Sequence, residues 1–282
     1  PSSNVAEEAR KHGVNTLCSF FNLATAKKIV SKHGHADALI AANVMCHIPD
    51  LHGLAQGIDH LLNPMGVLVF EEPYLGDMIK NTAYDQIYDE HVYIFSVHSV
   101  INIFSKHGFE LINIKPQSTH GGSMRYILAR KGKRAVSPSI EKQLNYEDKN
   151  NLHIRSTYDL FREKCELSRK DLVSILQQQK NDGRRVVGYA ATSKSTTVLN
   201  YCGIGPDLIN FISDTTPIKQ GKYSPGVHIP VLPYEELQNG YPDTLLLFAW
   251  NHKTEIMEKE SSFLEKGGEW ITYVPDVTLI RK

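Results

Sequence analysis

The chain has 282 residues, of which 41% are hydrophobic and 22% charged, as in a globular protein with a sizeable core. Its 31 basic and 31 acidic residues cancel, so no overall charge attracts nucleic acid or an acidic membrane. The cysteines show no C-x-x-C pair, which argues against a zinc knuckle or a disulfide framework and favours a reducing, cytoplasmic compartment.

Strand and helix signals alternate through the first half of the chain. We expect strands at residues 14–18, 36–43, 66–70, 109–114 and 124–130, and helices at residues 5–12, 25–33, 51–62 and 99–106. The run at 36–43 is apolar, as in a strand buried on both faces. The alternation predicts a mostly parallel sheet with helices on both faces, and the two closely spaced last strands predict an antiparallel hairpin.

Residues 131–150 are polar and charged, and we predict a linker there. A long amphipathic helix is expected at 158–180, after which the alternation restarts. Further strands are expected at residues 185–189, 208–212, 244–250 and 269–274, and helices at residues 196–201 and 254–266. The restart predicts two α/β domains, at residues 1–135 and 136–282, with the long helix leading the second.

Tyr88, Glu90, His91 and Tyr93 fall within six residues, shortly after an apolar strand. Proton abstraction beside a carbonyl needs a histidine base, a carboxylate that sets its tautomer, and a tyrosine hydroxyl that donates to the oxyanion. The alternative is a tyrosine-rich helix whose polar groups satisfy one another. The segment therefore predicts either an enolate-forming site or a structural cluster.

Several motifs carry a family resemblance. Asn43-Val-x-x-His47-Ile, a helix and then Leu62-Asn-Pro-Met-Gly66 before a strand resemble the second half of a class I S-adenosylmethionine-dependent methyltransferase. Together with Glu72-Pro-Tyr-Leu, Asp85-Gln-Ile-Tyr-Asp-Glu-His-Val and His120-Gly-Gly-Ser-x-Arg, they look like the sugar C-methyltransferases, which act on nucleotide-linked 4-keto deoxysugars. Residues 188–203 and 214–226 resemble that family's C-terminal domain.

The resemblance implies a class I methyltransferase (Rossmann-like) sheet followed by a second, smaller α/β Rossmann-like domain. It also implies that the family's zinc domain, first strands and glycine-rich cofactor loop stand before Pro1, so that the sheet is incomplete at its N-terminus. Zinc is then expected only in that absent domain. We expect no metal site in the present chain.

Carried over position by position, the resemblance makes His91 the general base that removes the C3 proton beside the C4 ketone. Tyr88 and Glu90 match its active-site neighbours, and His47 matches a histidine on the facing loop. Because these residues follow consecutive buried strands, we expect the four of them to meet in one cleft at the carboxyl ends of the first sheet. As a lone residue, His47 would more often be structural.

The cofactor S-adenosylmethionine is expected to contact Ser2, Phe20, Phe21 and Asn43. The two phenylalanines stack on adenine in this interpretation, and they belong to the core in the alternative one. The methyl sulfonium must lie in line with the enolate carbon for transfer.

The substrate is expected to contact Glu72, Lys194, Ser195, Lys222 and Tyr223. Lys194 and Ser195 follow a strand and open a helix, which suits a sugar diphosphate. In the loop from Lys219 to Gly226, Lys222 and Tyr223 offer a cation and a stacking ring, although a surface turn is enough to explain the proline and glycines there. Glu72 either points into the cleft or caps a turn.

The sequence thus predicts a cytoplasmic, monomeric S-adenosylmethionine-dependent C-methyltransferase that binds a nucleotide sugar, and neither nucleic acid nor membrane. One alternative is methylation of oxygen or nitrogen on another small molecule, which the full Tyr/Glu/His set argues against. The other is a non-catalytic nucleotide-binding remnant, which the expected lack of the glycine loop favours.

Overall fold

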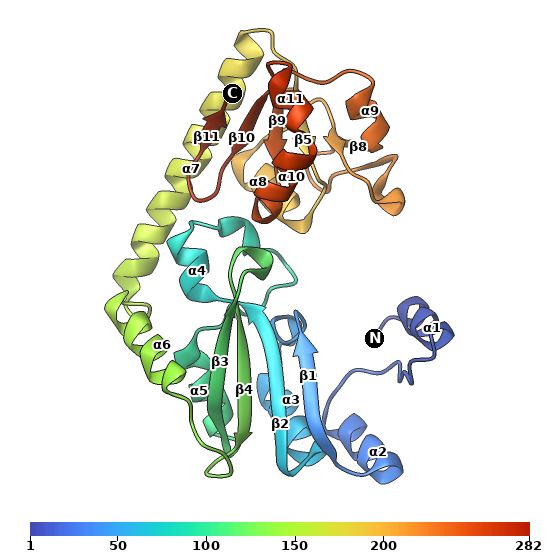
Figure 1. Ribbon diagram of the computed structural model, residues 1–282, viewed down its shortest axis with the longest axis vertical. Helices are drawn as coiled ribbons and strands as arrows, with labels where there is room; N and C mark the ends of the chain where they lie inside the picture. The colour runs from blue at the N-terminus through green and yellow to red at the C-terminus, as the bar shows by residue number, and fades with distance from the viewer. The chain divides into compact units, whose positions relative to one another are not determined.

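The computed structural model describes all residues from 1 to 282. The chain packs into two units that interleave along the sequence. The first unit comprises Pro1–Pro73, Val92–Gln117 and Ser123–Lys149, and the second comprises Tyr74–His91, Ser118–Gly122 and Asn150–Lys282. Figure 1 labels the elements of both units. None of the helices combines the length and the apolar character that crossing a membrane requires.

The first unit is built on one four-stranded sheet in the order β1-β2-β4-β3. Its strands are β1 (Ala36–Ala42), β2 (Leu62–Pro73), β3 (Phe109–Gln117) and β4 (Ser123–Arg130). β1 and β2 are parallel, whereas β4 pairs antiparallel with both β2 and β3. The predicted final hairpin is therefore confirmed, but the sheet is mixed rather than mostly parallel.

The helices of the first unit are α1 (Ser3–Lys11), α2 (Leu23–His33), α3 (Leu51–Leu61), α5 (Val97–Ser105) and α6 (Pro138–Lys149). α3 packs on β2, and α5 and α6 pack on β3. The core lies under these helices. There Phe70 of β2 contacts Phe95, Phe104 and Tyr126, and its ring centroid is 4.8 Å from that of Tyr126.

Two expectations for the first sheet are wrong. β1 is an edge strand and is not buried on both faces, since the side chain of Ile40 is 77% exposed. An apolar run encodes the strand, but burial depends on the elements that cover it. Residues 14–18 form no strand, because a strand needs a partner and no neighbouring strand pairs with them. Val14 and Leu17 are exposed.

The expected linker at 131–150 contains helix α6. Its buried Glu147 stabilises the start of α5 by accepting the backbone N–H groups of Val97, at 2.6 Å, and of His98, at 3.1 Å. The same carboxylate accepts from Nδ1 of His98 at 2.7 Å. A carboxylate at a helix N-terminus satisfies free N–H groups and matches the helix dipole.

The second unit has a seven-stranded sheet in the order β11-β10-β9-β5-β6-β8-β7. Its strands are β5 (Val186–Tyr189), β6 (Ile212–Ser213), β7 (Lys222–Tyr223), β8 (Pro230–Leu232), β9 (Thr244–Leu247), β10 (Glu269–Thr272) and β11 (Thr278–Ile280). The edge strands β7 and β11 are antiparallel, and every other pair is parallel. The strand order reverses between β5 and β9, which is where open α/β sheets form a crevice.

The helices of the second unit are α4 (Leu75–Lys80), α7 (Arg155–Asn181), α8 (Ser193–Cys202), α9 (Tyr234–Gln238), α10 (Lys253–Lys259) and α11 (Ser261–Glu265). The helix expected at 254–266 is thus two helices, which meet at the buried Glu260. The carboxylate of Glu260 accepts the hydroxyl protons of Tyr189 and Tyr234. The strand expected at 208–212 begins only at Ile212.

We predict that Glu147→Ala lowers the free energy of unfolding by about 1 to 2 kcal/mol, because the first turn of α5 loses its acceptor. Urea denaturation followed by circular dichroism measures this change. The control is Glu163→Ala, an exposed glutamate in the interior of α7, which should change the midpoint little. Equal midpoints for the two variants would contradict the capping role.

Candidate active site

His91 lies in the second unit, five residues after the buried turn η2 (Tyr84–Gln86). Its Nδ1 donates to the backbone carbonyl of Gln86 at 2.8 Å, and its backbone N–H donates to the carbonyl of Tyr88 at 2.9 Å. A carbonyl oxygen only accepts, so Nδ1 carries the proton and Nε2 is the basic nitrogen. The segment thus fixes the imidazole in one tautomer.

Tyr88 and Glu90 flank His91 differently. The ring of Tyr88 lies against the imidazole, with centroids 3.9 Å apart and planes inclined by 33°. Glu90 is exposed, and the partner of Nδ1 is the Gln86 carbonyl rather than this carboxylate. The expectation that a carboxylate sets the tautomer is therefore wrong. The sequence pattern could not reveal a main-chain acceptor.

The loop after β1 belongs to the first unit and is held by Glu72. One oxygen of this buried carboxylate accepts the backbone N–H groups of Val44, at 3.0 Å, and Met45, at 2.7 Å. The other oxygen is buried without a hydrogen-bond partner. Of the two roles considered for Glu72, the structure shows turn capping, and contact with a substrate stays a prediction.

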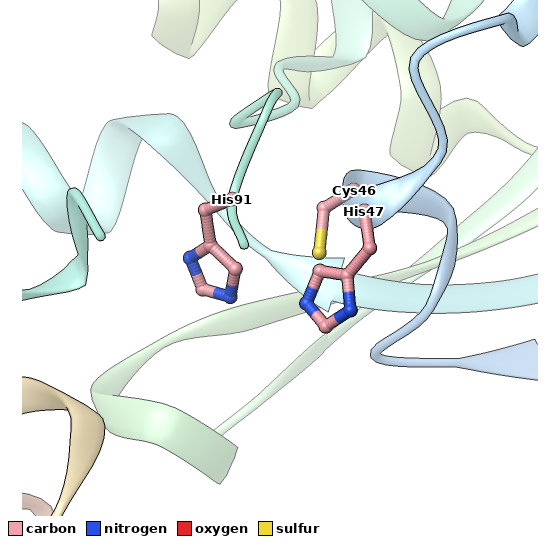
Figure 2. A group of neighbouring side chains, drawn as sticks. All are labelled: Cys46, His47 and His91. Carbon is pink, nitrogen blue, oxygen red and sulfur yellow. The ribbon is translucent and has the colours of Figure 1, made fainter. Parts of the chain in front are cut away.

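Cys46 and His47 follow in the turn η1 (Met45–His47). Figure 2 shows their side chains leaving the turn on the same side, and it also draws His91 of the second unit. The Cys46 sulfur and a ring nitrogen of His47 lie within 4.8 Å of one another. The carbonyl of Cys46 accepts the N–H of Tyr93, whose hydroxyl donates to Pro49 at 2.7 Å. Tyr93 therefore supports this loop.

The residues expected to hold the cofactor lie in the first unit. Asn43 follows β1, is exposed, and has a φ of 52°. Phe20 is 73% exposed, so its ring face is accessible. Phe21 is half-buried and packs against Gly57 of α3. Ser2 precedes α1 and its hydroxyl donates to the side chain of Asn4.

Three of the expected substrate residues line one cavity in the second unit, with a volume of about 450 Å³. They are Ser195, Lys222 and Tyr223, joined there by Lys219 and Ile218. The cavity lies at the start of α8, where Thr192 and Ser195 form a reciprocal capping box. A helix N-terminus beside lysine side chains favours an anion.

The two lysines of this cavity differ in their partners. Lys219 donates to the carbonyl of Ala191 at 2.7 Å and lies 3.3 Å from the Asp214 carboxylate. Burial raises the pKa of Asp214, but hydrogen bonds from Thr216 and Ala191 and the charge of Lys219 outweigh this effect and lower it. Asp214 is therefore ionised at neutral pH and neutralises Lys219. Lys222 is exposed and pairs with no carboxylate, so it is the cation available to a ligand.

Lys194 does not line this cavity, contrary to the grouping expected from sequence. Its side chain is buried and donates to the carbonyl of His120 and to the side-chain oxygen of Asn251, both at 3.2 Å. Its ammonium lies 4.3 Å from the centre of the Trp250 ring. The sequence suggested that the positive charge of Lys194 would bind a diphosphate, but this ammonium contacts groups inside the protein instead.

Asp85 is a further buried group, to which sequence reasoning gave no role. One oxygen accepts from the Trp250 indole at 2.6 Å and from the Tyr273 hydroxyl at 2.7 Å. These partners stand 165 and 188 positions later in the chain. The motif around Asp85 marked the segment, but nothing local in the sequence identifies such partners.

The Gly121-Gly122 pair forms the turn between β3 and β4, and both residues have positive φ. A Cβ on Gly121 would lie 2.0 Å from the Trp250 ring, and one on Gly122 would lie 2.4 Å from Asp77. The pair is therefore a turn packed against protein. Glycine is required there because no side chain fits.

Known proteins resemble this chain along nearly its whole length. Residues 118–275 match the family model of the C-methyltransferase C-terminal domain, and residues 1–114 match a methyltransferase domain model. The C-methyltransferase NovU of Streptomyces niveus is 34% identical over 281 residues, which cover 99% of this chain and 67% of NovU.

Solved structures show weaker likeness. A SAM-dependent methyltransferase from Anabaena variabilis has 16% identity and a TM-score of 0.32, over 41% of this chain and 58% of that one. The magnesium protoporphyrin IX methyltransferase ChlM from Synechocystis, solved with bound SAH, has 18% identity and a TM-score of 0.26, over 34% and 46%. The chain thus spans about half the length of these two structures. The family models and NovU confirm the resemblance seen in the motifs: the chain belongs to the C-methyltransferase family and is a methyltransferase.

Proposed function

We propose that this protein transfers a methyl group from S-adenosylmethionine to the carbon beside the C4 ketone of a nucleotide-linked deoxysugar. Membership of the C-methyltransferase family supports transfer to carbon. The observation that carries the proposal is the hydrogen bond from Nδ1 of His91 to the Gln86 carbonyl. It leaves Nε2 as a defined base. A carbon beside a ketone must lose a proton before it can be methylated and so requires a base, whereas an atom that is already nucleophilic does not.

In this mechanism Nε2 of His91 removes the C3 proton and becomes part of an imidazolium. The electrons of the C–H bond form the enolate double bond, and the ketone oxygen becomes an oxyanion. Tyr88, which packs on the His91 ring, is the proposed donor to that oxyanion. His47 and Glu90 are proposed to complete the site. S-adenosylmethionine, when bound, supplies the methyl group that the C3 carbon takes as the carbon–sulfur bond breaks.

The residues after β1 and before α2 fit parts of this cofactor. The exposed ring of Phe20 suits the adenine face, and the exposed side-chain amide of Asn43 suits its polar atoms. Phe21 and Ser2 are proposed as flanking contacts. Titration calorimetry with S-adenosylmethionine tests this assignment, and the absence of any heat of binding would favour a non-catalytic remnant.

The cavity at the start of α8 is the proposed site of the nucleotide. Lys222 supplies a cation for the diphosphate, Tyr223 supplies a ring for stacking, and Ser195 lies at the helix N-terminus. Both Lys222 and Tyr223 are exposed, so neither would have to leave another partner to contact a ligand. Glu72 is proposed as a further substrate contact, through its unpartnered oxygen.

We predict that His91→Asn lowers turnover by about two to four powers of ten while leaving the affinity for S-adenosylmethionine nearly unchanged. Asparagine keeps a polar side chain but has no basic nitrogen. Methylation of a nucleotide-linked 4-keto deoxysugar measures the rate, and calorimetry measures cofactor affinity. His33→Asn, in an exposed position at the end of α2, is the matched control and should retain wild-type turnover.

Deuterium exchange from solvent at the sugar carbon, followed without S-adenosylmethionine, isolates the proton-abstraction step. His91→Asn should abolish this exchange. A variant that still methylates at the wild-type rate would show that His91 is not the base, and Tyr88 would be tested next.

We predict that Lys222→Ala raises the KM for the nucleotide sugar about tenfold and leaves kcat within about twofold, because the lost contact binds substrate and transition state alike. Steady-state kinetics over a range of substrate concentrations measure both constants. Lys164→Ala, an exposed position on α7, is the control. An unchanged KM in Lys222→Ala would remove this cavity from the proposed nucleotide site.

A further inference from the structure

The crevice between β5 and β9 is occupied by the protein's own chain. Trp250 follows β9, Tyr273 follows β10, and Lys194 lies in the first turn of α8 after β5. Two of these side chains bond to Asp85 in η2, and α8 packs against the same turn. Sheets of this kind usually bind a ligand at this place. Here it holds the turn that precedes His91.

Asp85 is completely buried. One of its oxygens accepts both hydrogen bonds, at 2.6 Å from the Trp250 indole and 2.7 Å from the Tyr273 hydroxyl, and the other oxygen is buried without a hydrogen-bond partner. The Trp250 indole is a donor only, so the carboxylate must accept. A buried carboxylate is costly unless donors surround it. This cost restricts η2 to the one position in which both donors reach Asp85.

A closed set of contacts joins Asp85 to Gln86, and we call these residues the Asp85 network: Asp85, Gln86, His120, Lys194, Trp250 and Tyr273. From Asp85 the path runs to Trp250 and then to the Lys194 ammonium over its ring. Lys194 donates to the His120 carbonyl at 3.2 Å, which also accepts from the Gln86 side chain at 3.4 Å. Gln86 is thus held through its neighbour in sequence and through its own side chain.

The two buried charges of the network support one another. Burial raises the pKa of Asp85, while the charge of Lys194 and the hydrogen bonds from Trp250 and Tyr273 act against this shift. Burial lowers the pKa of Lys194, and the charge of Asp85 acts against that shift. Removing the charge of either residue therefore weakens the hold on the other.

We propose that Asp85 is a positioning residue for the base: through the Asp85 network it places the Gln86 carbonyl where that carbonyl accepts the proton of His91 Nδ1. The inference rests on the proposed role of His91. It assigns to Trp250, Tyr273 and Lys194 a common task, which is to hold the main chain that selects the tautomer of the base. Asp85 itself touches no reacting atom.

The test compares Asp85→Asn with Tyr84→Phe in the full chain. Asparagine keeps the shape of Asp85. Depending on the orientation of its amide, it presents either an NH₂ group or a weaker acceptor oxygen to the Trp250 indole and the Tyr273 hydroxyl. Tyr84 lies in the same buried turn, but its hydroxyl faces Cys202 and Ser168 rather than the network. We expect Asp85→Asn to lower kcat about 10- to 100-fold with KM within about twofold, and Tyr84→Phe to retain kcat.

A second readout does not depend on activity. The imidazole ¹⁵N shifts of His91, identified as the signals missing from His91→Asn, report which ring nitrogen carries the proton. The wild-type protein and Tyr84→Phe should show the Nδ1–H tautomer. Asp85→Asn should show a mixture of tautomers. A loss of stability alone would not move these shifts.

Trp250→Phe is the second variant, and it serves if Asp85→Asn does not fold. Phenylalanine keeps a ring beside Lys194 and removes only the indole donor, so it should cause the same changes in smaller degree. Wild-type kcat together with an unchanged Nδ1–H tautomer in the folded variants would overturn the inference. Wild-type turnover of His91→Asn would instead refute the proposed function, and the tautomer readout would still decide whether Asp85 positions the ring.

Discussion

The second unit depends on the burial of one carboxylate. The Trp250 indole, the Tyr273 hydroxyl and the charge of Lys194 compensate Asp85 for part of the hydration that it loses on burial. Those groups come from the ends of separate strands and the start of a helix. Because the central strands are parallel, their carboxyl ends lie at one edge of the sheet. The need of Asp85 for donors therefore ties the position of the turn η2 to that edge.

This requirement connects the fold to the chemistry. His91, the proposed base, needs a defined tautomer, and a main-chain carbonyl supplies it. A main-chain carbonyl moves only when its segment moves. The orientation of the His91 ring is therefore only as well defined as the position of η2, the turn before it. The α/β sheet of the second unit therefore has two uses: its cavity at α8 offers a place for a ligand, and its central crevice holds a part of the protein.

Local patterns in the sequence predicted much of this fold. Amphipathic spacing predicted the long helix α7, and the close spacing of two strands predicted the β3–β4 hairpin. The motif around His91 marked the segment that we propose to carry the base. What could not be predicted depends on neighbours distant in sequence: the exposure of Ile40, the tautomer set by Gln86, and the partners of Asp85. Helix α6 was missed because it buries little, mainly Ile140 and Glu147.

The interleaving of the two units has a consequence for recombining relatives. The two family models meet at residues 114–118, which invites a crossover between proteins at that point. Such a chimaera would take Asp85 from one parent and Trp250 and Tyr273 from the other. Parents whose residues differ at these contacts would yield a hybrid with an unmatched buried charge. Segment 74–91 must therefore be exchanged together with the C-terminal sheet, even though the sequence places it far upstream.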